Sequence, residues 1–162
     1  MAVTPKYTDL HRVSVTGIVY RSDGKYLITK RSLKKKAFPG KWTVPGGGLD
    51  VNDYINTPKT YPGHPQWYNI IEKTLKREIL EETNVVVDNL EYLVDLVFII
   101  PDGTPSVVLS YYCRYVSGDV KYDEDTIDHA WVTAEEAKKY DLIEGIAEEI
   151  KMVSDILKKR VS

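Results

Sequence analysis

One short segment of the chain concentrates side chains that could do chemistry. Residues 77–82 have the sequence Arg-Glu-Ile-Leu-Glu-Glu, and the preceding aliphatic residues Ile71, Leu75 and Ile79 recur every four positions, as on one face of a helix. Placed on a helical wheel with Ile71 at zero, Glu78 and Glu82 fall at about -20° and 20°, within the apolar stripe. Glutamates that served only solubility would lie on the opposite face.

The spacing of these glutamates predicts a partner of opposite charge. Glu78 lies three residues before Glu81 and four before Glu82, and like charges at these spacings destabilise a helix by a few tenths of a kcal/mol, about 0.2–0.5 per pair. Clustered carboxylates without a neighbouring Cys or His favour a hard divalent cation such as Mg²⁺. The alternative is that they are surface glutamates paired with Lys73 and Arg77.

The elements around this segment indicate an α/β (α+β) domain with a mixed sheet covered by helices. Expected features are a hairpin of residues 12–20 and 26–29, a helix over 67–83 that stops at Asn84, a hairpin of 86–100 and 107–116, and a strand over 129–132. Thr133 is expected to cap a short helix through Glu136, and an apolar stripe predicts a terminal helix. The length of 162 residues fits one domain.

A segment without clear periodicity precedes the carboxylate helix. Residues 49–65 contain three prolines and predict a long irregular connection, a kind of loop that often forms a lid or a binding site. Three aromatic side chains in and beside it, Tyr54, Tyr61 and Trp67, fit either stacking on a nucleobase or packing against the body of the domain.

Composition excludes several classes of function. Twenty-two basic and 24 acidic side chains give a formal charge of -2, so no global positive field would hold duplex nucleic acid. The first ten residues lack the apolar core of a signal peptide, no apolar run approaches the roughly 20 residues of a membrane span, and the single Cys113 cannot form an internal disulfide. A cytoplasmic protein is expected.

Together with the glycines upstream, the segment resembles the Nudix hydrolase family. The family's box has a glycine, five residues, a glutamate, seven residues, and then R-E-U-x-E-E-x-G-U, with U a bulky aliphatic residue. Residues 77–85 match the second half, except that Asn84 replaces the glycine, and residues 42–47, Trp-Thr-Val-Pro-Gly-Gly, resemble the motif that commonly opens the box. The resemblance implies a Nudix-like α/β/α sandwich with a central mixed sheet.

Two further departures concern the first half of the box. Gly47 precedes Arg77 by 30 positions where the box has 14, so a 16-residue insertion is expected, placed at about residues 49–65. Counting eight positions back from Arg77 reaches Asn69 instead of glutamate. This departure puts the full metal complement in doubt.

The resemblance implies attack of water on a phosphorus of a nucleoside diphosphate linked to another moiety. It makes Glu78, Glu81, Glu82 and the Gly47 carbonyl ligands of Mg²⁺, with Mn²⁺ as a substitute. Arg77 would orient the glutamates, Glu81 or Glu82 would act as the base, and Glu124 or Asp125 would add an acid. The Gly47 backbone would approach the substrate. The basic stretch of residues 30–41 fits either a solvated loop or a rim that attracts phosphates, and on the second interpretation Lys30, Arg31 and Lys41 meet the substrate.

The resemblance leaves more than one class of substrate open. The compact single domain and residues 39–42, Pro-Gly-Lys-Trp, resemble the family members that hydrolyse nucleoside triphosphates, and this resemblance implies the same substrate class here. Pro101, 16 positions beyond the box, is at a place associated in the family with ADP-ribose hydrolysis, although a strand turn would equally require proline there. Asn69 instead favours a noncatalytic nucleotide-binding module. Dimers are frequent in the family, so a homodimer is compatible with the resemblance.

Overall fold

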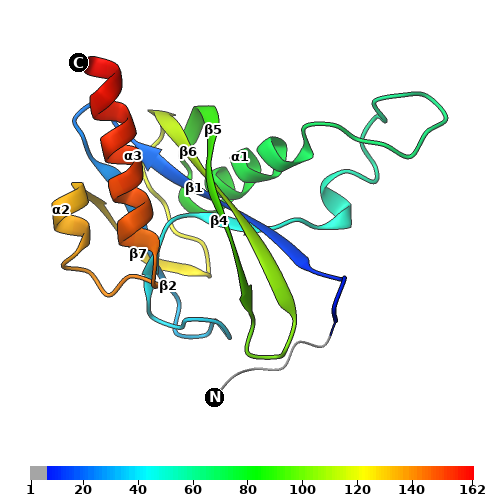
Figure 1. Ribbon diagram of the computed structural model, residues 1–162, viewed down its shortest axis with the longest axis horizontal. Coiled ribbons are helices and arrows are strands. Elements are labelled where there is room, and N and C mark those ends of the chain that lie inside the picture. Colours follow the sequence, from blue (N-terminus) through cyan, green and yellow to red (C-terminus); the bar gives the residue numbers. More distant parts are fainter. Residues whose placement is uncertain (1–6) are drawn as a thin grey trace.

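The computed structural model describes residues 7–162. Runs of strands are separated by helix α1 and followed by two helices (Figure 1). The order is β1 (Arg12–Tyr20), β2 (Tyr26–Arg31), β3 (Trp42–Thr43), β4 (Gly46–Gly48), the 3₁₀ turn η1 (Val51–Asp53), α1 (Ile70–Thr83), β5 (Val86–Ile99), β6 (Pro105–Ser117), β7 (Thr126–Val132), α2 (Ala134–Ala137) and α3 (Ile146–Val161). The prediction that the first residues form no signal peptide rests mainly on residues 1–6, which lie outside the described range.

The strands form one mixed sheet. Its main path is β3-β2-β1-β6-β5, with β4 paired to β1 and β7 paired to β2. β1 and β6 are parallel, whereas β1 and β4, β2 and β7, and β5 and β6 are antiparallel. The predicted mixed sheet is confirmed.

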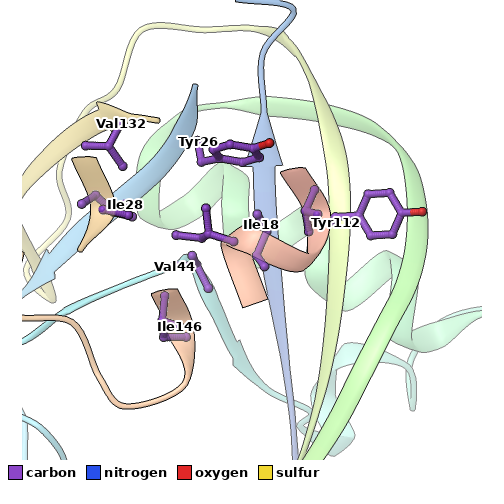
Figure 2. Packing of buried hydrophobic residues seen from close by; sticks show 10 residues of the cluster. Ile18, Tyr26, Ile28, Val44, Tyr112, Val132 and Ile146 are labelled. Carbon is purple, nitrogen blue, oxygen red and sulfur yellow. The ribbon is translucent and has the colours of Figure 1, made fainter. Parts of the chain in front are cut away.

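Helices cover both faces of this sheet. On one face, Leu75 and Ile79 of α1 pack against Val15 and Val19 of β1 in a fully buried cluster. On the other face, Ile146 and other apolar residues of α3 pack over β1, β2 and β7 (Figure 2). The arrangement is an α/β/α sandwich, as the resemblance implies.

Several local predictions are confirmed. Helix α1 ends at Thr83, and Asn84 follows in the left-handed conformation with a φ of 61°. Thr133 and Glu136 form the expected capping box at α2. The turn of residues 101–104 joins β5 and β6.

Other predictions are corrected in extent. Strands β1 and β2 do follow one another antiparallel, but their only paired positions are Tyr20 and Tyr26, because β2 continues against β7 while β1 continues against β4 and β6. Helix α1 begins at Ile70 instead of residue 67, and β7 begins at Thr126 instead of residue 129. Among the described residues, no helix is both long and apolar enough to cross a membrane.

The buried face of α1 provides a test of this packing. We expect Ile79→Ala to lower the free energy of unfolding by about 2–5 kcal/mol, because Ile79 is fully buried and the smaller side chain leaves a cavity. Urea denaturation measures the change. Leu80→Ala, on the exposed side of the same helix, is the control and should change stability by less than about 0.5 kcal/mol. Equal losses in the two variants would contradict the packing.

Candidate active site

Helix α1 lies against the glycine run of β4. Residues 46–48 pair with residues 14–16 of β1, and a Cβ atom built on Gly47 would overlap the Glu78 carboxyl group. The Glu78 side chain, which is only 19 % exposed, therefore lies on the backbone of Gly47. A side chain at position 47 would therefore displace the Glu78 carboxyl group from the strand, whereas glycine lets the two lie in contact.

Glu82 contacts the same strand one helical turn later. The Gly46 N–H donates a hydrogen bond of 3.2 Å to Glu82 Oε2. Burial raises the pKa of Glu82 to about 8, against the Gly46 hydrogen bond, which lowers it. The neighbouring carboxylates Glu78 and Asp123 raise this pKa further, and the Lys35 ammonium lowers it.

Arg77 binds three carboxylates at once. Its guanidinium donates to Asp53 at 2.5 Å, to Glu78 at 2.9 Å and to Glu81 at 2.8 Å. Burial alone would lower the pKa of Arg77, but Glu78, Asp53 and Glu81 outweigh it and the pKa rises. Burial raises the pKa of Glu78 in spite of the Arg77 charge. The compensating charge expected for the glutamates is thus supplied, at least in part, by this guanidinium.

Asp53 is the residue that sequence reasoning missed. It follows Gly47 with five residues between them, the interval at which the box has its glutamate, and its nearly buried carboxylate binds Arg77. Counting forward from Gly47 would have found it, whereas counting back from Arg77 led through the insertion to Asn69. With Asp53 at the glutamate position, the 16 extra residues would be residues 54–69, which overlap the expected insertion at about 49–65. Asn69 lies immediately before α1, with a φ of 60°.

Asn84, the other departure, fits the position of the box glycine. Its backbone is left-handed, a conformation that asparagine tolerates better than most residues, and its side-chain amide donates to the Asp119 carbonyl at 3.0 Å. The replacement is therefore compatible with the end of the helix.

The structure separates the two basic residues predicted to meet the substrate. Arg31 faces the carboxylates: burial lowers its pKa, and Glu82 and Asp125 counter that effect. Lys41 instead forms an exposed ion pair with Asp141 at 2.5 Å. Lys35, which the sequence did not single out from the basic stretch, is among the charges acting on Glu82.

The acidic loop before β7 approaches the site through a different residue from those predicted. Glu124 is exposed and makes no hydrogen bond or ion pair within residues 7–162, and Asp125 pairs with Lys35 at 2.8 Å. Asp123 is the carboxylate that acts on Glu82, and its Oδ1 also accepts the N–H groups of Asp125 and Thr126. The sequence offered no signal that distinguishes Asp123 from its neighbours.

The oxygen atoms around Glu78 and Glu82 are ligands of the kind that a hard divalent cation takes. In the described part of the chain, no three Asp, Glu, His or Cys side chains are gathered as a metal site, and Arg77 engages both Glu78 and Glu81. The available groups are carboxylate oxygens and the backbone of Gly47 beside Glu78, with no thiolate or imidazole among them. Such a set suits an ion that takes a few carboxylates and keeps water and phosphate oxygens as its other ligands.

Comparison with models of protein families identifies the family of this chain. The model of the NUDIX domain matches residues 10–153, which include the glycine run, the carboxylate helix and the sheet. The chain belongs to the Nudix family. It is thus a Nudix-type hydrolase of phosphoanhydride bonds, in a family that generally uses a divalent metal ion and small nucleotide substrates.

Curated relatives agree with this assignment. A nucleoside triphosphatase NudI from Klebsiella pneumoniae is 30 % identical over 143 residues, covering 82 % of this chain and 89 % of the relative. One from Escherichia coli is 28 % identical over 142 residues, covering 75 % and 82 %.

Solved Nudix structures share the fold. The MutT protein from Methanosarcina mazei has a TM-score of 0.69 at 20 % identity and covers 98 % of this chain and 99 % of its own. The NUDIX domain of Shewanella oneidensis NrtR, complexed with ADP ribose, has the same TM-score and identity and covers 98 % and 93 %.

The Asp53–Arg77 ion pair makes a testable contribution to stability. We expect Asp53→Asn to lower the free energy of unfolding by about 1–3 kcal/mol, because it weakens a charge-assisted hydrogen bond to a nearly buried carboxylate. Guanidinium denaturation measures the loss. Asp23→Asn, which removes the exposed pair with Arg21, is the matched control and should cost at most about 1 kcal/mol. If the two variants lose the same amount, Asp53 does not hold the helix.

The metal-free protein should lose stability as the pH rises. Glu82 has an ordinary pKa of 4.5 unfolded and about 8 folded, so between these values only the folded state keeps the proton, and stability falls with increasing pH. With EDTA present, we expect the fall between pH 5 and pH 8 to be smaller in Glu82→Gln by a few kcal/mol, about 2–4. Denaturant titrations at several pH values measure it.

The exposed Glu144→Gln is the control for this experiment and should follow the wild type. Glu149, whose pKa burial also raises, contributes equally in all three proteins. A slope in Glu82→Gln identical to that of the wild type would show that Glu82 is not the group responsible.

Proposed function

We propose that the protein is a Mg²⁺-dependent pyrophosphohydrolase of a nucleoside diphosphate linked to another moiety, with nucleoside triphosphates as its preferred substrates. The observation that carries this proposal is the placement of Glu78 and Glu82 against the glycine run of β4, with Arg77 bound to the adjacent carboxylates. The names of the NudI relatives support the substrate class.

Each side chain has a distinct role in this proposal. Glu78, Glu82 and the Gly47 carbonyl would hold the cation, and Glu81 would be the third ligand or the base. Glu81 is the most accessible of the group, with a side chain 56 % exposed, so water can reach it. Arg77 is a positioning residue, because its donors are engaged by carboxylates of the protein.

The reaction is a hydrolysis at phosphorus. Water adds to one phosphorus as the phosphoanhydride bond breaks, so a nucleoside triphosphate gives a nucleoside monophosphate and pyrophosphate. Mg²⁺, when bound, would neutralise phosphate oxygens and acidify water. The protein contributes position: the carboxylates are fixed by the contact of α1 with β4, and one of them accepts the proton that water loses.

Two further contacts follow from the basic and acidic loops. Arg31 is the better candidate for the substrate phosphates, since it already faces Glu82, whereas Lys41 would first have to release Asp141. The additional acid predicted at Glu124 is better supplied by Asp123, which acts on Glu82. Both assignments rest on the electrostatic effect that Glu82 has on Arg31 and that Asp123 has on Glu82.

The alternatives have less support. Pro101 begins the turn between β5 and β6, where Gly103 N–H donates to the Ile100 carbonyl, so the turn itself accounts for the proline and an ADP-ribose specificity is not needed. The noncatalytic module was favoured by Asn69, but Asp53 stands at the interval of the box glutamate and binds Arg77. That observation favours an enzyme.

The wider setting of the protein belongs to the same proposal. We infer one Nudix-like domain over residues 1–162, acting in the cytoplasm on small nucleotides without binding duplex nucleic acid or a membrane. The family match to residues 10–153 supports the single domain, and the balanced charge supports the absence of duplex binding. A homodimer has support in the edge strand β5, where Tyr92 and Val97 are exposed.

Release of pyrophosphate from nucleoside triphosphates tests the proposal. We expect turnover that requires Mg²⁺ and falls by about 100-fold in Glu78→Gln and Glu82→Gln, because each amide keeps the shape of the side chain but not its negative charge. Product chromatography and a coupled pyrophosphate assay measure the rates.

Glu144→Gln serves again as the control and should retain full turnover. Circular dichroism shows whether each variant is folded. Turnover that continues undiminished in folded Glu82→Gln, or that needs no divalent metal, would contradict the proposal.

A further inference from the structure

An open pocket lies where the inserted segment meets the start of helix α1. Its volume is about 490 Å³, within the range typical of small-molecule sites. One wall comes from the two ends of the insertion, Tyr54 and Trp67, and the other from Leu49, Ile71, Glu72 and Tyr111. Figure 1 shows the insertion extending away from the sheet beyond the N-terminal end of α1, so the pocket is at the root of this projection.

The wall formed by the insertion is held in place by its own contacts. The rings of Tyr54 and Trp67 have centroids 5.2 Å apart, and Trp67 Nε1 donates to the Thr57 carbonyl at 3.0 Å. Tyr54 directly follows Asp53, which Arg77 binds. These contacts hold the two ends of the insertion together, and Asp53 ties them to the carboxylate helix.

The lining is aromatic and aliphatic except for Asn69 and Glu72, and its one formal charge is that of Glu72. Neither the Glu72 carboxylate nor the Tyr111 hydroxyl forms a hydrogen bond or an ion pair with any residue between 7 and 162 that would occupy it. The two groups are close enough that Glu72 adds to the effect of burial in raising the pKa of Tyr111. A phosphate would be repelled by this carboxylate, whereas an N–H donor would be bound by it.

We propose that this pocket binds a nucleobase that presents N–H donors to Glu72 while its ring lies against Trp67 and Tyr54. Stacking on aromatic rings supplies affinity for a planar heterocycle, and the carboxylate supplies selectivity for its edge. The identification of the heterocycle as a nucleobase rests on the proposed function. The pocket gives the insertion a role in substrate choice that is separate from hydrolysis.

The charge of Glu72 distinguishes between bases. Guanine carries N1–H and an exocyclic amino group on one edge, which match the two oxygens of a carboxylate. Uracil has a single N3–H between two carbonyl oxygens, and these would face the negative charge. The pocket should therefore prefer guanine to uracil.

Binding of nucleosides, which lack phosphates, tests the pocket without the reaction. Guanosine and uridine are titrated into the full chain with EDTA present, and dissociation constants are measured by calorimetry. We expect the wild type to bind guanosine more tightly than uridine. Trp67→Ala should weaken guanosine binding by about tenfold or more, the effect of losing one stacked ring. Glu72→Gln should weaken guanosine binding about tenfold and remove most of the preference over uridine.

Two matched variants complete the experiment. Tyr61→Ala alters the insertion outside the pocket, where Tyr61 packs on Tyr68, and should leave both dissociation constants unchanged. Trp67→Phe keeps a ring and should retain most guanosine binding, which covers the case in which Trp67→Ala does not fold.

Absence of guanosine binding to the wild type, or binding unaffected by Glu72→Gln and Trp67→Ala, overturns the proposal. Metal-dependent hydrolysis would persist in that case. Failure of the proposed function would instead appear as guanosine binding without hydrolysis.

Discussion

The structure around the site depends on one guanidinium. Arg77 binds Glu78 and Glu81 on its own helix and Asp53 in the turn that precedes the insertion. Without it, carboxylates on adjacent helical turns would repel one another. Among the residues that the structure describes, no other ion pair connects η1 to this part of α1. An arginine suits this position because its planar, permanently charged group offers five donors in a fixed geometry.

The same contact explains how a 16-residue insertion leaves the site intact. The chain departs after Asp53 and returns at Asn69, one residue before α1 begins, so both ends of the insertion are fixed on the body of the domain. The cost of closing a flexible loop grows only slowly with its length. A longer connection is therefore tolerated, provided that the Asp53–Arg77 pair fixes its start and the buried face of α1 fixes its end.

Sequence reasoning succeeded where a signal was local. The spacing of Ile71, Leu75 and Ile79 predicted both the helix and its buried face, and the interval from Thr133 to Glu136 predicted a cap. The position of Glu78 and Glu82 within the apolar stripe predicted that they do more than keep the helix soluble, and both contact the glycines of β4.

The misses concern contacts between distant parts of the chain. The pair of Lys41 with Asp141 depends on how the residues before β3 lie beside the segment between α2 and α3. The approach of Lys35 and Asp123 to Glu82 depends on where loops 32–41 and 118–125 lie relative to α1. Side-chain type alone does not decide such contacts. The basic loop offers several lysines and the acidic loop several carboxylates, and nothing in the sequence distinguishes the one that reaches the site. Asp53 is different: its interval from Gly47 was visible, but the insertion concealed the matching interval to Arg77.

Helix α1 finally separates two kinds of chemistry along its length. Its first turn contributes Glu72 and Ile71 to an aromatic pocket, and its later turns carry Glu78 and Glu82. With a rise of 1.5 Å and a turn of 100° per residue, Glu72 and Glu78 are about 9 Å apart along the axis and about 120° apart around it. A substrate that occupies both regions must therefore extend along and around the helix, with its base at the insertion and its phosphates at the glycine run. Because Arg77 fixes the insertion and the carboxylates together, the distance between base recognition and bond cleavage is set by the protein and not by the ligand.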